Sequence, residues 1–247
     1  MWNSVDQIYI VTYQGSPKRA QCEKQVKLLK IPPGKCTWTN RPKMEIPTCV
    51  LSSQIKNHIW AYQHAKDNNY NNIIVLEDDF LIYDPETSVP EMDYKTEYFL
   101  KKYPKYDIFY YGYFPLKIDS KYNDSGIIKM EGLLLHAYLI HSNFYSIFLN
   151  LDIEVCVNIF FYPEPHDVWV YGLQANKRHS SYAVFPQLVY QDNMPVAQLF
   201  PKGNKNKKIF KFLCDLVSEL KYNSDVYSKI ITIILLLLCL AKFMYSY

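Results

Sequence analysis

The sequence predicts an α/β protein with a central, mostly parallel sheet flanked by helices. The first observation is a strand-like run, residues 7–13 (QIYIVTY), followed by a helical segment. The second is an apolar run, residues 73–76 (IIVL), that follows the next helical segment. Because this run has no polar alternation, both faces of its strand must be covered, as in sheets with helices on both sides. The 247 residues suffice to bury one full core.

Turn and helix signals predict the elements around these two strands. The turn residues QGSP follow the first strand, and a helix is expected from Arg19 to about Lys30. Four prolines make residues 31–50 irregular, with at most one short strand. A second helix is expected from Ser52, capped by Ser52 or Ser53, because apolar residues recur at helical spacing after it.

The rest of the body is predicted to continue the alternation of strands and helices. The expected elements, in order, are a helix over 91–102, strands over 107–113, 127–130 and 133–141, a helix over 142–149 capped by Ser142, a helix beginning at 166–167, and a short strand over 185–192.

Two of the predicted strands carry aromatic side chains or a histidine. Tyr110, Tyr111 and Tyr113 suit a packed core, although beside carboxylates they would also make a stacking wall for a base or a sugar ring. Core is the favoured assignment because aromatic strands are ordinary core elements. His136 lies in an apolar run and is expected to be a hydrogen-bonded core histidine rather than a ligand.

The composition excludes several classes of protein. The seven glycines form neither GxGxxG nor GxxxxGK[ST], which argues against a Rossmann dinucleotide loop and a P-loop. The six cysteines contain no CxxC pair, so neither a zinc site nor a disulfide framework is indicated, and reduced thiols in the cytoplasm are the simplest account. No N-terminal signal peptide is expected, because charged Asp6 and a strand-like run follow Met1 closely.

The basic residues are concentrated near the C-terminal end. Residues 201–247 hold 8 of the 27 basic and 3 of the 24 acidic residues, which leaves 19 basic and 21 acidic residues before them. A slightly acidic body argues against nucleic acid as a partner, since phosphate neutralisation needs clustered Lys and Arg.

An acidic cluster ends the second apolar strand, where Glu77, Asp78 and Asp79 follow IIVL directly. Three neighbouring anions at the edge of a core repel one another, and a divalent cation held by oxygen ligands relieves that repulsion. The sequence therefore predicts a metal site here, with Asp79 as the direct ligand. The alternative is that Asp78 and Asp79 only open a solvated loop.

Two further places carry candidate site residues. Arg19 follows the first strand, where ligands collect in α/β sheets, and it suits a phosphate or a carboxylate unless it is an ordinary surface cation. His166 and Asp167 stand where the late helix begins. Asp167 is either a helix cap or a general base, and it is the best placed candidate base for an acceptor hydroxyl.

The C-terminal tail is predicted to attach the body to a membrane. We expect a basic amphipathic linker over 201–225 and a hydrophobic anchor over 226–247. The twelve uncharged residues 230–241 fall short of the ~20 that span a bilayer, but flanking lysines can snorkel. The preceding basic residues place the body on the cytoplasmic side. An interfacial helix and a buried oligomerisation helix are the alternatives.

These features together favour sugar transfer from a nucleotide-activated donor. A divalent cation can bridge the diphosphate of such a donor and neutralise the leaving group, so the protein needs only a base near the acceptor. A carboxylate-metal nuclease would need a similar cluster, but it would also need a basic surface that this body lacks.

Residues 5–192 contain, in order, the motifs IYIVTY with SPKR, CVLSSQI, IIVLEDDF, HAYLIHS, PHDVW and PQLVYQ. This order of motifs resembles glycosyltransferase family 25, which includes lipooligosaccharide and collagen galactosyltransferases. The resemblance implies a GT-A fold over residues 1–200 and an enzyme, normally inverting, that uses Mn²⁺ (or Mg²⁺) and a nucleotide-diphospho-sugar. It implies hexose transfer, such as galactose or glucose, to a glycan, lipid or protein acceptor.

The resemblance also assigns roles to individual residues. By match to the family's motifs, Glu77, Asp78 and Asp79 correspond to its metal and donor acidic motif, and Arg19, Ser52 and Asp167 to its arginine, serine and late acid. We therefore expect Asp167 to be the catalytic base. The expected metal ligands are Glu77, Asp79 and His166, and the expected donor-binding residues are Thr12, Arg19, Ser52, Glu77 and Asp78.

Two departures from the family pattern are visible. Ser53 stands where the family has His, so a donor contact of that His is lost or supplied by His58. The hydrophobic tail is unlike the small bacterial members and suggests a compact viral version. A non-catalytic, membrane-tethered interaction module with the same body is the alternative to the enzyme.

Overall fold

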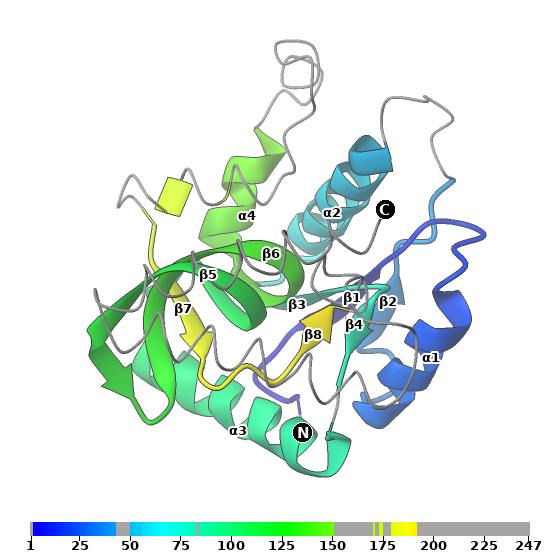
Figure 1. Ribbon diagram of the computed structural model, residues 1–247. Coiled ribbons are helices and arrows are strands. Elements are labelled where there is room, and N and C mark those ends of the chain that lie inside the picture. Colours follow the sequence, from blue (N-terminus) through cyan, green and yellow to red (C-terminus); the bar gives the residue numbers. More distant parts are fainter. Residues whose placement is uncertain are drawn as a thin grey trace, which may run out of the picture.

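The computed structural model describes residues 2–42, 50–82, 84–150 and 179–191, together with Val170, Leu173 and Gln174. These residues form a central sheet with helices on both of its faces (Figure 1). The predicted helix at residues 166–167, the linker 201–225 and the anchor 226–247 lie outside the described residues. Within the described ranges, no helix is long and apolar enough to cross a membrane.

The main sheet has six strands in the order β2-β1-β3-β6-β5-β7. Parallel pairing joins β1 to β2, β1 to β3 and β5 to β7, whereas β6 runs antiparallel to each strand that it contacts. Among the described strands of this sheet, five therefore share one direction, which confirms the predicted α/β class with a mostly parallel centre. The strands are β1 (Gln7–Val11), β2 (Cys36–Trp38), β3 (Asn72–Glu77), β5 (Ile108–Asp124), β6 (Ile127–His141) and β7 (Ser181–Val184).

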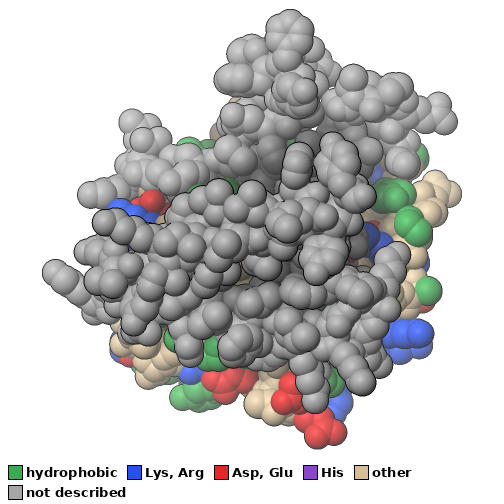
Figure 2. Space-filling view, in the orientation of Figure 1, with side chains coloured by type: hydrophobic (Ala, Val, Ile, Leu, Met, Phe, Trp, Pro, Cys, Tyr) green, Lys and Arg blue, Asp and Glu red, His purple; other side chains and the backbone are tan. Residues whose placement is uncertain are grey.

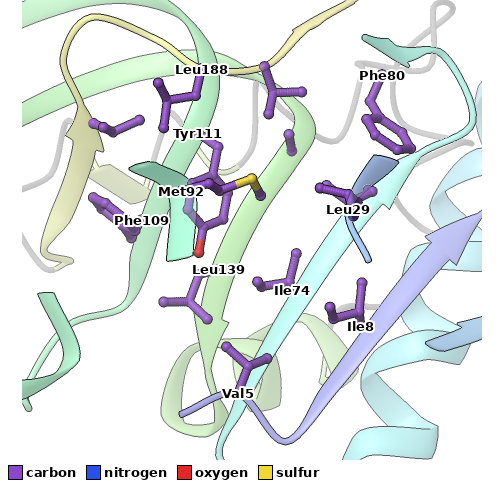
Figure 3. Packing of buried hydrophobic residues seen from close by; sticks show 14 of the residues in the cluster. Val5, Ile8, Leu29, Ile74, Phe80, Met92, Phe109, Tyr111, Leu139 and Leu188 are labelled. Atoms are coloured by element: carbon purple, nitrogen blue, oxygen red, sulfur yellow. The ribbon is translucent and has the colours of Figure 1, made fainter. Parts of the chain in front are cut away.

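Alternation along the strands builds one core on each face of the sheet. On one face, Ile8, Ile74 and Leu139 pack with α1 (Arg19–Leu28) and α3 (Pro85–Lys102). Figure 3 shows this cluster, with the three side chains on neighbouring strands and Met92 of α3 among them. Tyr9, Val75 and Tyr138 point to the other face, where α2 (Val50–Asp67) and α4 (Ser142–Leu149) cover them. Both faces are thus buried, as the apolar IIVL run predicted.

Helix starts differ from the sequence predictions. α2 begins at Val50, so Ser52 and Ser53 lie inside its first turns and neither is its N-cap. α3 begins at Pro85 rather than near residue 91, because a proline in the first turn lacks only an N–H that would have no helical partner. α4 is capped by His141, whose side chain accepts from the Asn143 amide, and not by Ser142.

The strands after α3 are longer than predicted. The segments expected at 127–130 and 133–141 form one strand, β6, because β5 runs alongside them to residue 124 and pairs with residues 131 and 132 as well. Cross-strand pairing therefore overrides the local break at Glu131-Gly132. The turn between β5 and β6 contains Ser125 and Gly126, both with positive φ.

The strand expected over residues 185–192 is replaced by a connection and a short strand. β4 (Phe80–Leu81) pairs with β8 (Tyr190–Gln191) in a separate two-stranded sheet. The connection is held by the carbonyl oxygen of Tyr111, which accepts from the amides of Leu188 at 2.9 Å and Val189 at 3.1 Å. This pairing places the end of β8 beside the turn that follows β3.

Charged side chains occupy the rim of the molecule in one view. Figure 2 shows acidic and basic side chains next to one another along the lower margin, where Figure 1 places α3. Lys101 and Glu97 of α3 form one such exposed pair at 2.8 Å.

Candidate active site

The acidic cluster lies at the carboxyl edge of the parallel strands. β1 and β3 are parallel and pair Val11 with Glu77, so the residues that follow each strand meet at the same edge. Asp78 and Asp79 form the turn between β3 and β4. Ligands of open α/β sheets bind outside the carboxyl ends of the strands, and the predicted position of the site is therefore consistent with the fold.

Asp78 ties the loop after β1 to the end of β3. Its Oδ2 atom accepts from the Thr12 hydroxyl at 2.7 Å and from the Ser16 hydroxyl at 2.6 Å. Its backbone amide donates to the carbonyl oxygen of Val11 at 3.0 Å. Thr12 was expected to bind the donor, and the structure shows that its hydroxyl bonds to Asp78. The alternative of an open, solvated loop is thus wrong for Asp78, because its carboxylate is built into the edge of the sheet.

Asp79 is buried, with 6% of its surface exposed, and it contacts a lysine. The Lys18 ammonium lies 2.8 Å from Oδ2, and the Gln191 amide donates to the same oxygen at 3.2 Å. Burial lowers the pKa of Lys18, but the charge and hydrogen bond of Asp79, with Asp78 and Glu77 behind it, outweigh burial and raise it overall. The Oδ1 atom is buried without a hydrogen-bond partner among the described residues.

Glu77 lies on the α2 face of the sheet and is held by a histidine from that helix. The Nε2 atom of His58 lies 3.1 Å from Oε1, and the Gln191 amide lies 3.4 Å from Oε2. Behind His58, its Nδ1 atom is 2.8 Å from the Tyr138 hydroxyl, which is 2.5 Å from the Tyr62 hydroxyl. Burial is the main cause that raises the pKa of both phenols, so they remain protonated.

For a neutral His58 beside an ionised Glu77, the hydrogen bonds of this network run in one direction. The carboxylate only accepts, so the imidazole proton is then on Nε2. Nδ1 then accepts from Tyr138, and Tyr138 accepts from Tyr62. His58 is buried and contacts Glu77 and Tyr138. The suggestion that it contacts the sugar donor in place of the family's histidine remains a prediction.

The structure places the other predicted residues away from the turn or outside the described part of the chain. Arg19 begins α1, where its guanidinium stacks 3.5 Å from the centre of the Trp38 ring and its Nε donates to Glu23 at 2.7 Å. Ser52 lies in α2, and its side chain is outside the described part. Asp167 and His166 also lie outside it. Their roles remain predictions.

The aromatic residues and His136 were predicted to belong to the core. Tyr110, Tyr111 and Tyr113 are buried, which confirms that assignment over a stacking wall. His136 is also buried, but the predicted hydrogen bonds are missing, since neither ring nitrogen has a partner among the described residues. Desolvation lowers its pKa to about 4. It is therefore neutral at pH 7.

A divalent cation fits one position of this cluster better than the others. Both partners of Asp78 occupy its Oδ2, whereas Asp79 keeps a buried Oδ1 with no described partner. An unsatisfied buried carboxylate oxygen is the donor that Mn²⁺ or Mg²⁺ takes. Over the described ranges, no three His, Cys, Asp or Glu side chains form a complete metal cluster, and the third predicted ligand, His166, lies outside them.

Sequence reasoning missed the residues that surround the three carboxylates. Lys18 stands next to Arg19 in SPKR, and the choice between two adjacent cations depends on helix phase, which the motif does not reveal. His58 and Tyr62 are four residues apart on α2, a spacing that places them on one helix face. Gln191 left no local signal, because its contacts to Asp79 and Glu77 span 112 and 114 positions.

Comparisons with known proteins found fold-level likeness at low scores. A197 from STIV has a TM-score of 0.41 at 12% identity and covers 80% of this chain and 99% of that one. A glycosyltransferase involved in the glycosylation of the major capsid of PBCV-1 has a TM-score of 0.41 at 12% identity and covers 73% of this chain and 94% of that one. UDP-glucose pyrophosphorylase complexed with UDP-glucose has a TM-score of 0.40 at 12% identity and covers 72% of each chain.

No protein-family model matches the chain, and the search of curated proteins gave no match. The resemblance to glycosyltransferase family 25 therefore remains a prediction. At TM-scores near 0.4 the argument for function rests on the residues of this chain and their geometry.

Proposed function

We propose that the protein is a metal-dependent glycosyltransferase. It moves a hexose, such as galactose or glucose, from a nucleotide-diphospho-sugar to a hydroxyl of a glycan, lipid or protein acceptor, with inversion. One observation carries the proposal: the Asp78–Asp79 turn lies at the carboxyl edge of a mostly parallel sheet, with Asp78 held by two hydroxyls and a buried oxygen of Asp79 that has no hydrogen-bond partner among the described residues. A turn that only closed a loop would not need this support.

Asp79 would hold the cation through Oδ1, and Glu77 and His166 would complete its protein ligands. When bound, Mn²⁺ or Mg²⁺ supplies positive charge to the diphosphate, which stabilises the leaving group. Asp78 has a different task, since its carboxylate joins the loop after β1 to the turn and keeps Asp79 in position.

The remaining chemistry belongs to residues outside the described ranges. Asp167 is the proposed general base, which takes the proton of the acceptor hydroxyl from within about 3 Å. The tail over 226–247 would hold the body at a membrane with the site facing the cytoplasm. We propose no nucleic acid partner, because the body before residue 201 carries more acidic than basic residues.

A thermal-shift screen of nucleotide sugars with Mn²⁺ tests the proposal. A donor present at 100 times its dissociation constant stabilises the folded chain by about 2.7 kcal/mol, which raises the melting temperature by several degrees. Asp79→Asn should abolish the shift. Asp119→Asn is the matched control, because Asp119 is an exposed carboxylate on β5 and should leave the shift unchanged.

Transfer is then measured directly with the donor that gives the largest shift. Release of the nucleoside diphosphate should require Mn²⁺ or Mg²⁺ and should be lost in Asp79→Asn. If no nucleotide sugar shifts the melting temperature of the full chain with Mn²⁺ present, the proposed function is wrong.

A further inference from the structure

The carboxylates of Glu77, Asp78 and Asp79, here called the acidic turn, already have a positively charged side chain of the same protein beside them. The Lys18 ammonium is 2.8 Å from Oδ2 of Asp79, which is the carboxylate proposed to hold the metal. The other oxygen, Oδ1, is buried without a described partner. The two oxygens of one carboxylate thus differ, since Oδ2 contacts Lys18 and Oδ1 has no hydrogen-bond partner within the described part of the chain.

The Lys18 ammonium can move away from Asp79 while the rest of the site stays folded. Its side chain is 33% exposed, whereas that of Asp79 is 7% exposed. A lysine ammonium stands on a flexible four-carbon stem, and it can therefore swing towards solvent. The Gln191 amide and the hydroxyls on Asp78 carry no charge, so their hydrogen bonds are compatible with a divalent cation nearby.

A divalent cation on Oδ1 of Asp79 would stand within a few ångström of the Lys18 ammonium. Like charges at that separation repel each other strongly at a partly buried site. The anionic diphosphate of a nucleotide offsets the excess positive charge, because it is attracted to both cations. Metal binding without a nucleotide is thus disfavoured, and metal binding together with a nucleotide is not.

We infer that Lys18 is a built-in counter-ion of the acidic turn that couples divalent-cation binding to nucleotide binding. This inference rests on the proposed function and adds a regulatory property to the same site. Lys18 keeps the carboxylates compensated in the free protein and lowers their affinity for metal. A bound nucleotide offsets the repulsion between Lys18 and the metal. Mn²⁺ therefore raises the affinity of the protein for a nucleoside diphosphate, and the nucleoside diphosphate raises its affinity for Mn²⁺.

Calorimetric titration of the full chain with Mn²⁺, with and without UDP, tests the inference. In Lys18→Met the charge is removed and the stem is kept, and Mn²⁺ alone should bind at least about tenfold more tightly than to the wild type. The enhancement of Mn²⁺ affinity by UDP should shrink correspondingly. Lys24→Met removes an exposed lysine from α1 and should behave like the wild type.

Lys18→Arg distinguishes charge from shape, because it keeps the cation and should retain the weak Mn²⁺ affinity of the wild type. A melting curve without metal checks folding, and Lys18→Met should melt lower than Lys24→Met and recover when Mn²⁺ is added. Equal Mn²⁺ affinity in Lys18→Met and the wild type overturns the inference while leaving joint Mn²⁺ and UDP binding intact. If the folded wild type binds neither Mn²⁺ nor UDP, alone or together, the proposed function fails and the inference fails with it.

Discussion

The Nε2 atom of His58 lies 3.1 Å from the Oε1 atom of Glu77, and both side chains are buried. The pair joins α2 to the end of β3, and the Tyr138 hydroxyl continues the chain of contacts into the core. A carboxylate at this depth is stable only when polar partners surround it, because burial of an ionised group is costly. The acidic end of β3 is therefore held by α2 on one side and by the loop after β1 on the other.

His58→Ala should lower the free energy of unfolding by about 3 kcal/mol, because it removes a buried partner of a carboxylate and leaves a cavity. Tyr138→Phe deletes one hydroxyl from the same network and should cost about 1 kcal/mol. Urea unfolding monitored by circular dichroism measures both. A loss below about 0.5 kcal/mol for His58→Ala, the range of surface substitutions, would contradict this account.

Thr12→Val and Ser16→Ala each remove one hydrogen bond to Oδ2 of Asp78, and each should cost about 1–2 kcal/mol of unfolding free energy. Because both hydroxyls donate to the same oxygen, the two losses should not add, and a double-mutant cycle should show a coupling of at least about 0.5 kcal/mol. Ser146→Ala is the control, since that hydroxyl bonds only to a carbonyl of its own helix in the described contacts. Full additivity would mean that the two hydroxyls act independently.

His136 should make stability depend on pH. Its pKa is about 4 in the folded protein and 6.5 ordinarily, so between these values the unfolded chain binds the extra proton. The stabilisation of the folded state by the neutral His136 is complete above pH 6.5. It is lost as the pH falls towards 4, and the free energy of unfolding falls by up to about 3 kcal/mol. His136→Gln cannot titrate, and the difference in unfolding free energy between it and the wild type should therefore shrink over this window. A constant difference from pH 7 to pH 4 would exclude this role.

Gly112→Ala should displace the connection that leads to β8. A Cβ at Gly112 would lie 2.3 Å from both the His136 Nε2 atom and the Val189 carbonyl oxygen. Relief of such overlap costs about 1–3 kcal/mol and should also weaken nucleotide binding, because residues 188 and 189 precede the strand that holds Gln191. In Gly34→Ala the added Cβ meets no atom within 4 Å, although φ of +80° still causes strain. This control should lose about 1 kcal/mol and keep its nucleotide affinity.

The sequence pattern correctly predicted the elements whose structure depends mainly on residues near one another in the chain. The branched, apolar IIVL run predicted a covered strand, which the two cores confirm, and the three acids after it lie at the carboxyl edge of the sheet. The prediction of strand boundaries failed where pairing with another strand determines the length of a strand. β6 continues through Glu131-Gly132 because β5 pairs with it there, and no periodicity in residues 127–141 reports that partner.

In the candidate site, too, the residues that adjoin in the sequence could be predicted, whereas the residues that the fold brings to them could not. The acidic turn was predictable because mutual repulsion of three carboxylates is visible in the sequence. Arg19 was expected to bind the donor, and its guanidinium stacks on Trp38, whereas the neighbouring Lys18, which no prediction named, lies beside Asp79. Only the phase of α1 and the position of β2 distinguish these two residues. Gln191 could not have been assigned, since β8 reaches the turn through the fold alone.

The pairing of β4 with β8 sets an order in time for the assembly of the site. Asp79 and Gln191 are separated by 112 positions. At roughly 5–20 residues per second, a ribosome would therefore complete Gln191 on the order of ten seconds after Asp79. Throughout that interval the nascent chain contains the acidic turn without its β8 neighbour. During this interval the carboxylates of Glu77 and Asp79 thus lack the amide N–H groups that Gln191 donates to them in the finished protein.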